Sequence, residues 1–152
     1  MSLKEKLQND LTDAMRARDE IRSSTIRMIL TSIKNEEVAG KEARELNDAE
    51  IITVLSREAK KRREAAEAFD QAGAKDRADQ ERAEGVVIGE YLPKQLTEDE
   101  IKSLIATAMT ETGARTPAQM GLVMKSLQPK IAGKADGGLV SSLVKAALAG
   151  GN

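Results

Sequence analysis

The chain has 152 residues, with 24 basic and 25 acidic side chains and a formal net charge of −1 at pH 7. It contains no histidine and no cysteine, which excludes imidazole chemistry, disulfide bonds and thiolates. Phe69 and Tyr91 are its only aromatic residues, so stacking of bases on aromatic side chains cannot be used widely. We therefore expect no metal site and no cofactor, and any nucleic-acid binding should depend on local basic patches.

The sequence has no apolar run long enough to cross a bilayer. Its beginning, MSLKEKLQND, is too charged for the apolar part of a signal peptide. The absence of cysteine is compatible with a reducing compartment. We expect a cytoplasmic protein without membrane contact.

Apolar residues recur at helical spacing from the beginning of the chain. They predict a first helix over about residues 3–18. A second helix should follow, with an apolar stripe formed by Ile21, Thr25, Met28, Ile29 and Ile33.

Two further helices are expected before Pro93. Asn47 and Glu50 have the spacing of a capping box, which predicts a third helix over about residues 48–72, stopped by Gly73. A fourth helix is expected over about residues 75–89, although its apolar pattern is weaker.

The second half of the chain contains clearer helix signals. Thr97 caps a fifth helix, which Gly113 ends, and Pro117 takes the first position of a sixth. Pro129 marks a bend, after which Asp136 caps a seventh helix.

No period-two pattern of a strand is found, so the sequence predicts an all-α protein. We place the boundary in the short proline-bearing segment of residues 93–96. The expected architecture is an N-terminal four-helix region, residues 1–93, followed by a small three-helix C-terminal domain, residues 97–152.

The stretch MKSLQPKIAGKADGGLVSSLVKAAL contains a small basic loop between two helices. A connection of this kind needs only a cap and a flexible turn, which Asp136 and the glycines supply. The flanking lysines could instead contact a phosphate beside the N-terminus of the seventh helix. The candidate residues for RNA binding are Lys125, Lys130, Gly133, Lys134 and Lys145.

The stretch SREAKKRREAAE lies within the third helix and contains a secondary basic patch. Its members are Arg57, Lys60, Lys61 and Arg63. The favoured interpretation is a solvated face with i,i+4 ion pairs, among them Glu58–Arg62. Arg62 itself falls within the apolar stripe, so it should be partly buried and paired with a carboxylate, whereas Lys60 should face away.

The carboxylates of LTEDEI are typical of a first helical turn and favour the helix dipole. No base, nucleophile or metal-ligand set accompanies them. We therefore expect no catalytic residues in this chain.

Three stretches resemble the YqeY family: IRMILTSIKNEEV, EYLPKQLTEDEI and MGLVMKSLQPKIAGKADGGLVSSLV. The resemblance covers essentially the whole chain. The family is similar to the tail of GatB, the kinase and tRNA-binding subunit of glutamine-dependent tRNA amidotransferase. This resemblance implies an N-terminal helical domain and a C-terminal three-helix domain. It also implies the family-level activity of a carbon–nitrogen ligase with glutamine as amido-N donor.

Three functions remain open. The first is a non-catalytic module that binds tRNA, alone or beside amidotransferase subunits or a tRNA-charging enzyme. The second is a helical protein–protein adaptor without an RNA role, and the third is an enzyme in its own right. No DNA partner is expected.

Overall fold

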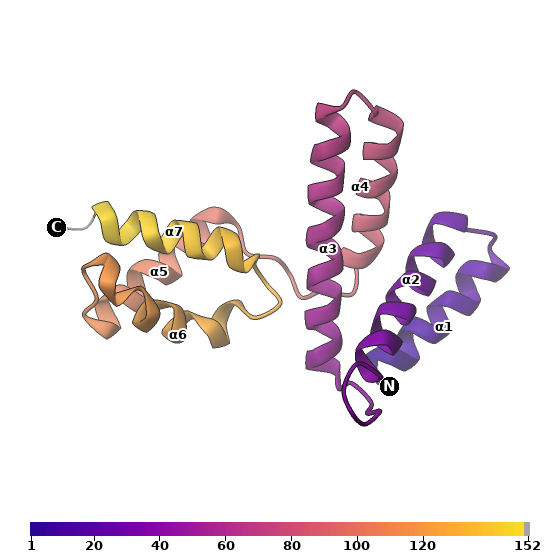
Figure 1. Cartoon of the computed structure of the whole chain (residues 1–152), viewed down its shortest axis with the longest axis horizontal. Helices are drawn as coiled ribbons and strands as arrows, with labels where there is room; N and C mark the ends of the chain where they lie inside the picture. The colour runs from indigo at the N-terminus through magenta and orange to yellow at the C-terminus, as the bar shows by residue number, and fades with distance from the viewer. Residues whose placement is uncertain (151–152) are drawn as a thin grey trace. The chain divides into compact units, whose positions relative to one another are not determined.

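The computed structural model describes residues 1–150. These residues form seven α-helices and one 3₁₀ turn and contain no strand, which confirms the all-α prediction. The chain divides into two compact units, Met1–Leu92 and Pro93–Asn152, each with its own hydrophobic core (Figure 1).

The N-terminal unit consists of two helical hairpins, α1–α2 and α3–α4 (Figure 1). The predicted ends of α3 are confirmed. Asn47 and Glu50 form a complete capping box at its beginning, and Gly73 follows its last turn at a φ of +74°. The helices are α1 (Leu3–Arg16), α2 (Glu20–Glu37), α3 (Asp48–Gln71) and α4 (Lys75–Gly89).

The core of this unit lies where the two hairpins pack together. Its largest fully buried side chains are Leu7, Ile26, Ile29, Ile33, Ile51, Leu55 and Ile88. The predicted stripe of α2 is wrong at Ile21, which is 44% exposed, and lacks Ile26, which is fully buried. At 100° per residue, Ile26 lies closer than Ile21 to the side shared by Ile29 and Ile33, so the buried side is rotated from the one predicted.

Arg62 lies in a largely buried ionic cluster, as its place on the apolar stripe predicted. Its side chain is 16% exposed and lies within ion-pair distance of three carboxylates, at 3.5 Å from Glu58, 3.5 Å from Glu81 and 3.2 Å from Glu84. Ser32 of α2 donates a hydrogen bond to Glu58. The cluster therefore connects α2, α3 and α4.

Glu37 makes a second buried polar contact, one that the sequence pattern did not reveal. The residue is 5% exposed, and its carboxylate accepts hydrogen bonds from Lys4 at 3.0 Å and from the backbone N–H of Leu46 at 3.1 Å. The Lys4 hydrogen bond, with help from Leu46, lowers the pKa of Glu37 below its ordinary value. The contact ties the end of α2 to α1 and to the segment before α3.

The C-terminal unit contains α5 (Glu98–Thr112), the 3₁₀ turn η1 (Pro117–Gln119), α6 (Met120–Ile131) and α7 (Gly137–Gly150). Thr97 and Glu100 form a complete capping box on α5, and Gly113 ends the helix in the left-handed region. The fully or nearly fully buried side chains of this unit are Ile101, Ile105, Ala108, Ala114, Val123, Leu127, Val140, Val144 and Leu148.

Two proline predictions in this unit need correction. Pro117 opens the short turn η1, so the α-helix proper starts only at Met120. Pro129 lies inside α6, which continues to Ile131 before the chain turns. Pro129 has no N–H group to donate, so α6 lacks one backbone hydrogen bond near its C-terminal end.

Candidate nucleic-acid interface

The loop between α6 and α7 is a fixed turn. The N–H of Lys134 donates to the carbonyl of Ile131 at 2.8 Å, and Gly133 has a φ of +72°, which glycine adopts without strain. The carbonyl of Lys134 in turn accepts from the N–H of Leu96 at 2.8 Å. These bonds use both the N–H and the carbonyl of Lys134, so its backbone groups are already paired within the unit.

Gln95 is a residue that sequence analysis missed. Its Nε2 donates to the carbonyl of Gly133 at 2.9 Å and to the carbonyl of Pro93 at 2.8 Å. The predicted linker is therefore attached to the loop between α6 and α7, and it belongs to the C-terminal unit. A lone glutamine in a polar segment gives no local signal of a partner 38 residues away.

The four lysines of the candidate interface expose their ammonium groups. Lys125 and Lys130 lie on α6, Lys134 in the loop and Lys145 on α7. Lys130 makes a long ion pair, 3.9 Å from Glu111. Within residues 1–150, the ammonium groups of Lys125, Lys134 and Lys145 have no ion-pair or hydrogen-bond partner. These three cations are therefore available to an external anion.

The N-terminus of α7 is partly occupied by its own cap. Asp136 precedes the helix, and its Oδ1 accepts from the N–H of Gly138 at 3.4 Å. The carbonyl of Asp136 accepts from Val140, the first helical hydrogen bond. A carboxylate at this point opposes a second anion, so an external phosphate would depend mainly on the lysines.

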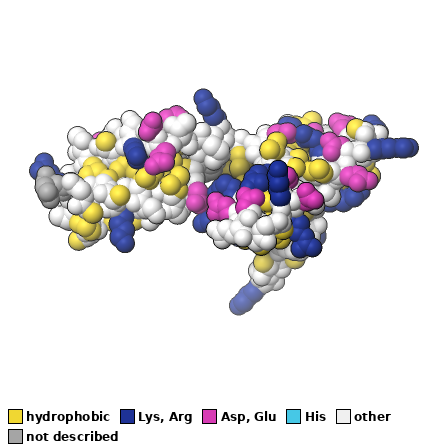
Figure 2. All heavy atoms as spheres, turned by 90° about the horizontal axis from the view of Figure 1, so that it is seen from above, with side chains coloured by type: hydrophobic (Ala, Val, Ile, Leu, Met, Phe, Trp, Pro, Cys, Tyr) yellow, Lys and Arg dark blue, Asp and Glu magenta, His cyan; other side chains and the backbone are white. Residues whose placement is uncertain are grey.

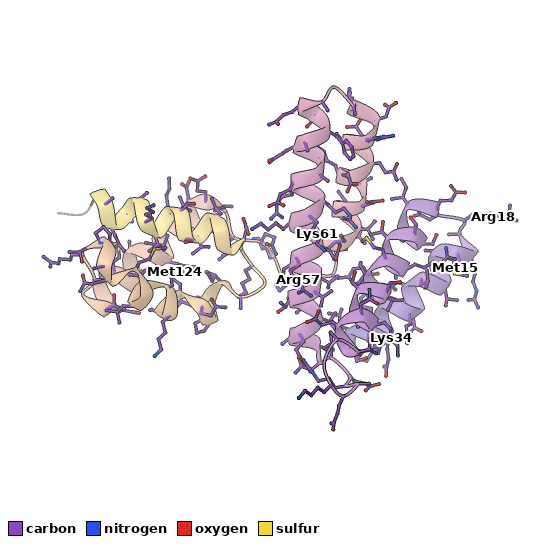
Figure 3. The ribbon with its side chains drawn as sticks, viewed as in Figure 1. Met15, Arg18, Lys34, Arg57, Lys61 and Met124 are labelled. Atoms are coloured by element: carbon purple, nitrogen blue, oxygen red, sulfur yellow. The ribbon has the colours of Figure 1, made fainter. Side chains whose placement is uncertain are left out.

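The secondary basic patch of α3 is more extensively neutralised. Arg57 pairs with Glu36 at 3.2 Å and Lys61 with Glu58 at 3.4 Å. Lys60 has intermediate exposure and is not free, and Arg63 is exposed. Figure 3 shows Arg57 and Lys61 one turn apart on α3. Of the expected i,i+4 pairs, Glu58–Arg62 is present, but Glu58 is buried. Arg57 pairs with α2 and not along its own helix.

The acidic residues at the beginning of α5 act as helix caps. Glu100 accepts from the N–H of Thr97 at 3.1 Å, and this backbone hydrogen bond lowers the pKa of its carboxyl. Among residues 1–150, no group of three or more carboxylates is arranged to hold a metal ion. None of the helices described is long and apolar enough to span a bilayer.

Comparison with known proteins identifies the family. The sequence profile of the YqeY-like proteins matches residues 4–148. The chain belongs to this family. The protein named "Altered inheritance of mitochondria protein 41, mitochondrial" from Lachancea thermotolerans is 29% identical over 147 residues, which are 93% of this chain and 76% of that protein. The protein of the same name from Clavispora lusitaniae is 30% identical over 129 residues, covering 83% of this chain and 74% of that protein.

The names of these relatives refer to mitochondrial inheritance and not to amidotransferase activity or RNA. Membership in the YqeY-like family is thus shown for almost the whole chain. Membership in a family does not by itself establish a biochemical activity, which depends on the residues exposed on the surface of the molecule.

Proposed function

We propose that this YqeY-like protein is a non-catalytic RNA-binding module with tRNA as its ligand, and that it acts alone or beside an amidotransferase or a tRNA-charging enzyme. The observation that supports this proposal best is the set of exposed lysine ammonium groups in the C-terminal unit, of which those of Lys125, Lys134 and Lys145 have no partner among the described residues. Unpaired cations of this kind favour contact with phosphates.

The expected mode of binding is contact with phosphates and RNA shape. The chain has only two aromatic residues, and Tyr91 is buried in the core of the N-terminal unit at 8% exposure. Lysines bind phosphate as point charges and do not read base edges in this arrangement. The proposal therefore predicts affinity that depends strongly on salt and weakly on sequence.

A titration with total tRNA over a series of salt concentrations tests the proposal. Each phosphate neutralised by a lysine contributes roughly 0.7–0.9 to the slope of log K against log salt. Binding with a slope of this kind supports the module. Absence of binding together with a stable protein partner would support the adaptor instead, and glutamine-dependent amidation by the purified chain would show an enzyme.

A cytoplasmic location is also proposed, because the sequence contains no cysteine, which is compatible with a reducing compartment. Both relatives carry the word mitochondrial in their names. Cell fractionation with an antibody to the chain distinguishes the two compartments.

A further inference from the structure

The N-terminal unit contains a groove between the beginning of α2 and the first half of α4. The α3–α4 hairpin extends past the beginning of α2 (Figure 1). Its volume is about 580 Å³, within the range of roughly 300–1,000 Å³ that is typical of pockets occupied by ligands. The lining residues are Glu20, Ile21, Ser24, Asp76, Asp79, Gln80 and Ala83.

Two exposed apolar side chains lie at the groove or next to its lining residues. Ile21 is 44% exposed at the groove and lies away from the buried side of α2 that Ile29 and Ile33 share. Val86 does not line the groove, but it is 66% exposed and lies three residues after Ala83, hence on the same side of α4. Apolar side chains that gather beside a groove mark a surface suited to a partner.

The charged residues that line the groove are all acidic: Glu20, Asp76 and Asp79. Arg82 offsets part of this charge, because it lies 3.2 Å from Asp79, but it also pairs with Asp70. The N-termini of α2 and α4 contribute about half a positive charge each, less than the three carboxylates. Figure 2, which views the molecule from above, shows acidic, basic and apolar side chains interspersed on this unit.

We propose that this groove docks a basic amphipathic helix of a partner protein. The apolar side of such a helix would cover Ile21 and Val86, and its lysines or arginines would face the three carboxylates. An acidic helix or a nucleic-acid backbone would meet like charge at the same place. The inference does not rest on the RNA proposal, because the groove belongs to the N-terminal unit and the unpaired lysines belong to the C-terminal unit.

A helical peptide probe tests the proposal on the full chain. The peptide has about 18 residues, with leucines at i, i+3, i+4 and i+7 and lysines elsewhere; a second peptide carries glutamate in place of lysine. Binding is followed by fluorescence anisotropy and by amide shifts of the isotope-labelled protein. The lysine peptide should bind and shift the amides around Ile21 and Ala83, and the glutamate peptide should not bind.

Variants locate the contact. E20Q/D76N should weaken binding of the lysine peptide about fivefold, since each exposed ion pair contributes roughly 0.2–1 kcal/mol. The matched control E42Q/E45Q removes two exposed carboxylates elsewhere and should leave the affinity unchanged. The proposal would be overturned if both double variants weakened binding equally or if both peptides bound equally. It would also be overturned if sedimentation showed that a second copy of the chain fills the groove.

Discussion

Replacement of Arg62 by methionine should strongly destabilise the N-terminal unit. The substitution retains much of the side-chain volume but removes the charge that faces Glu58, Glu81 and Glu84 at 3.2–3.5 Å. Removal of one member of a buried ion pair costs about 3–5 kcal/mol. The carboxylate side chains here are still 9–22% exposed and Lys61 remains near Glu58, so we expect about 2–4 kcal/mol.

Urea denaturation followed by fluorescence of Tyr91 measures this loss. Tyr91 is the only tyrosine in the chain and is 8% exposed, so it reports on the N-terminal unit. With an m-value of about 1.5 kcal/mol/M, the transition midpoint should fall by roughly 1.3–2.7 M. R63A, at an exposed arginine next along α3, is the matched control and should shift the midpoint by less than about 0.5 M.

Neutralisation of the carboxylates should restore part of the stability, because the cost arises from charges left without a counter-ion. We expect R62M/E81Q/E84Q to be more stable than R62M alone. A triple variant no more stable than R62M, or equal small effects of R62M and R63A, would refute the ionic account of the cluster.

Three further predictions concern other parts of the molecule. The hydrogen bond from Lys4 holds the pKa of Glu37 below its ordinary value of 4.5. The carboxylate therefore stabilises the fold fully above pH 4.5, and this stabilisation is lost as the pH falls through the lowered pKa. The urea midpoint of E37Q should decline less on acidification than the urea midpoint of the wild type. G133A should lower the melting temperature of the C-terminal unit through a cost of about 1 kcal/mol, because alanine is strained at a φ of +72°, whereas G121A in α6 should not. Trypsin should cut first after Lys94 and leave a helical N-terminal fragment on a gel, and early cuts within residues 21–72 would contradict the predicted domain boundary.

The helices could be predicted from the sequence wherever a local signal marks their ends. Asn47, Thr97 and Gly113 determine caps through side-chain and backbone preferences that act within a few residues. The burial of Arg62 followed from helical periodicity for the same reason. The partners of Gln95 could not be found in this way, because they are determined by how distant segments pack.

In the candidate site, too, the sequence predicts features set by nearby residues but not features set by the packing of helices. Exposure of Lys125, Lys134 and Lys145 agrees with their polar positions on the helices and in the loop. The ion pair of Lys130 with Glu111 and the acidic groove beside α2 depend on which helices pack together. Spacing along one helix contains no information about such contacts between helices.

The most direct test of the proposed function compares tRNA binding by the wild type and by K130A/K134A over a series of salt concentrations. The account predicts weaker binding of the variant by a similar factor for different tRNAs, and a salt slope smaller by roughly 0.7–0.9 for each lysine that contacts a phosphate. K41A/K75A removes two exposed lysines of the N-terminal unit and should retain both the affinity and the slope of the wild type. Unchanged affinity and slope in K130A/K134A would show that the loop between α6 and α7 is only a turn and would contradict the proposed RNA interface.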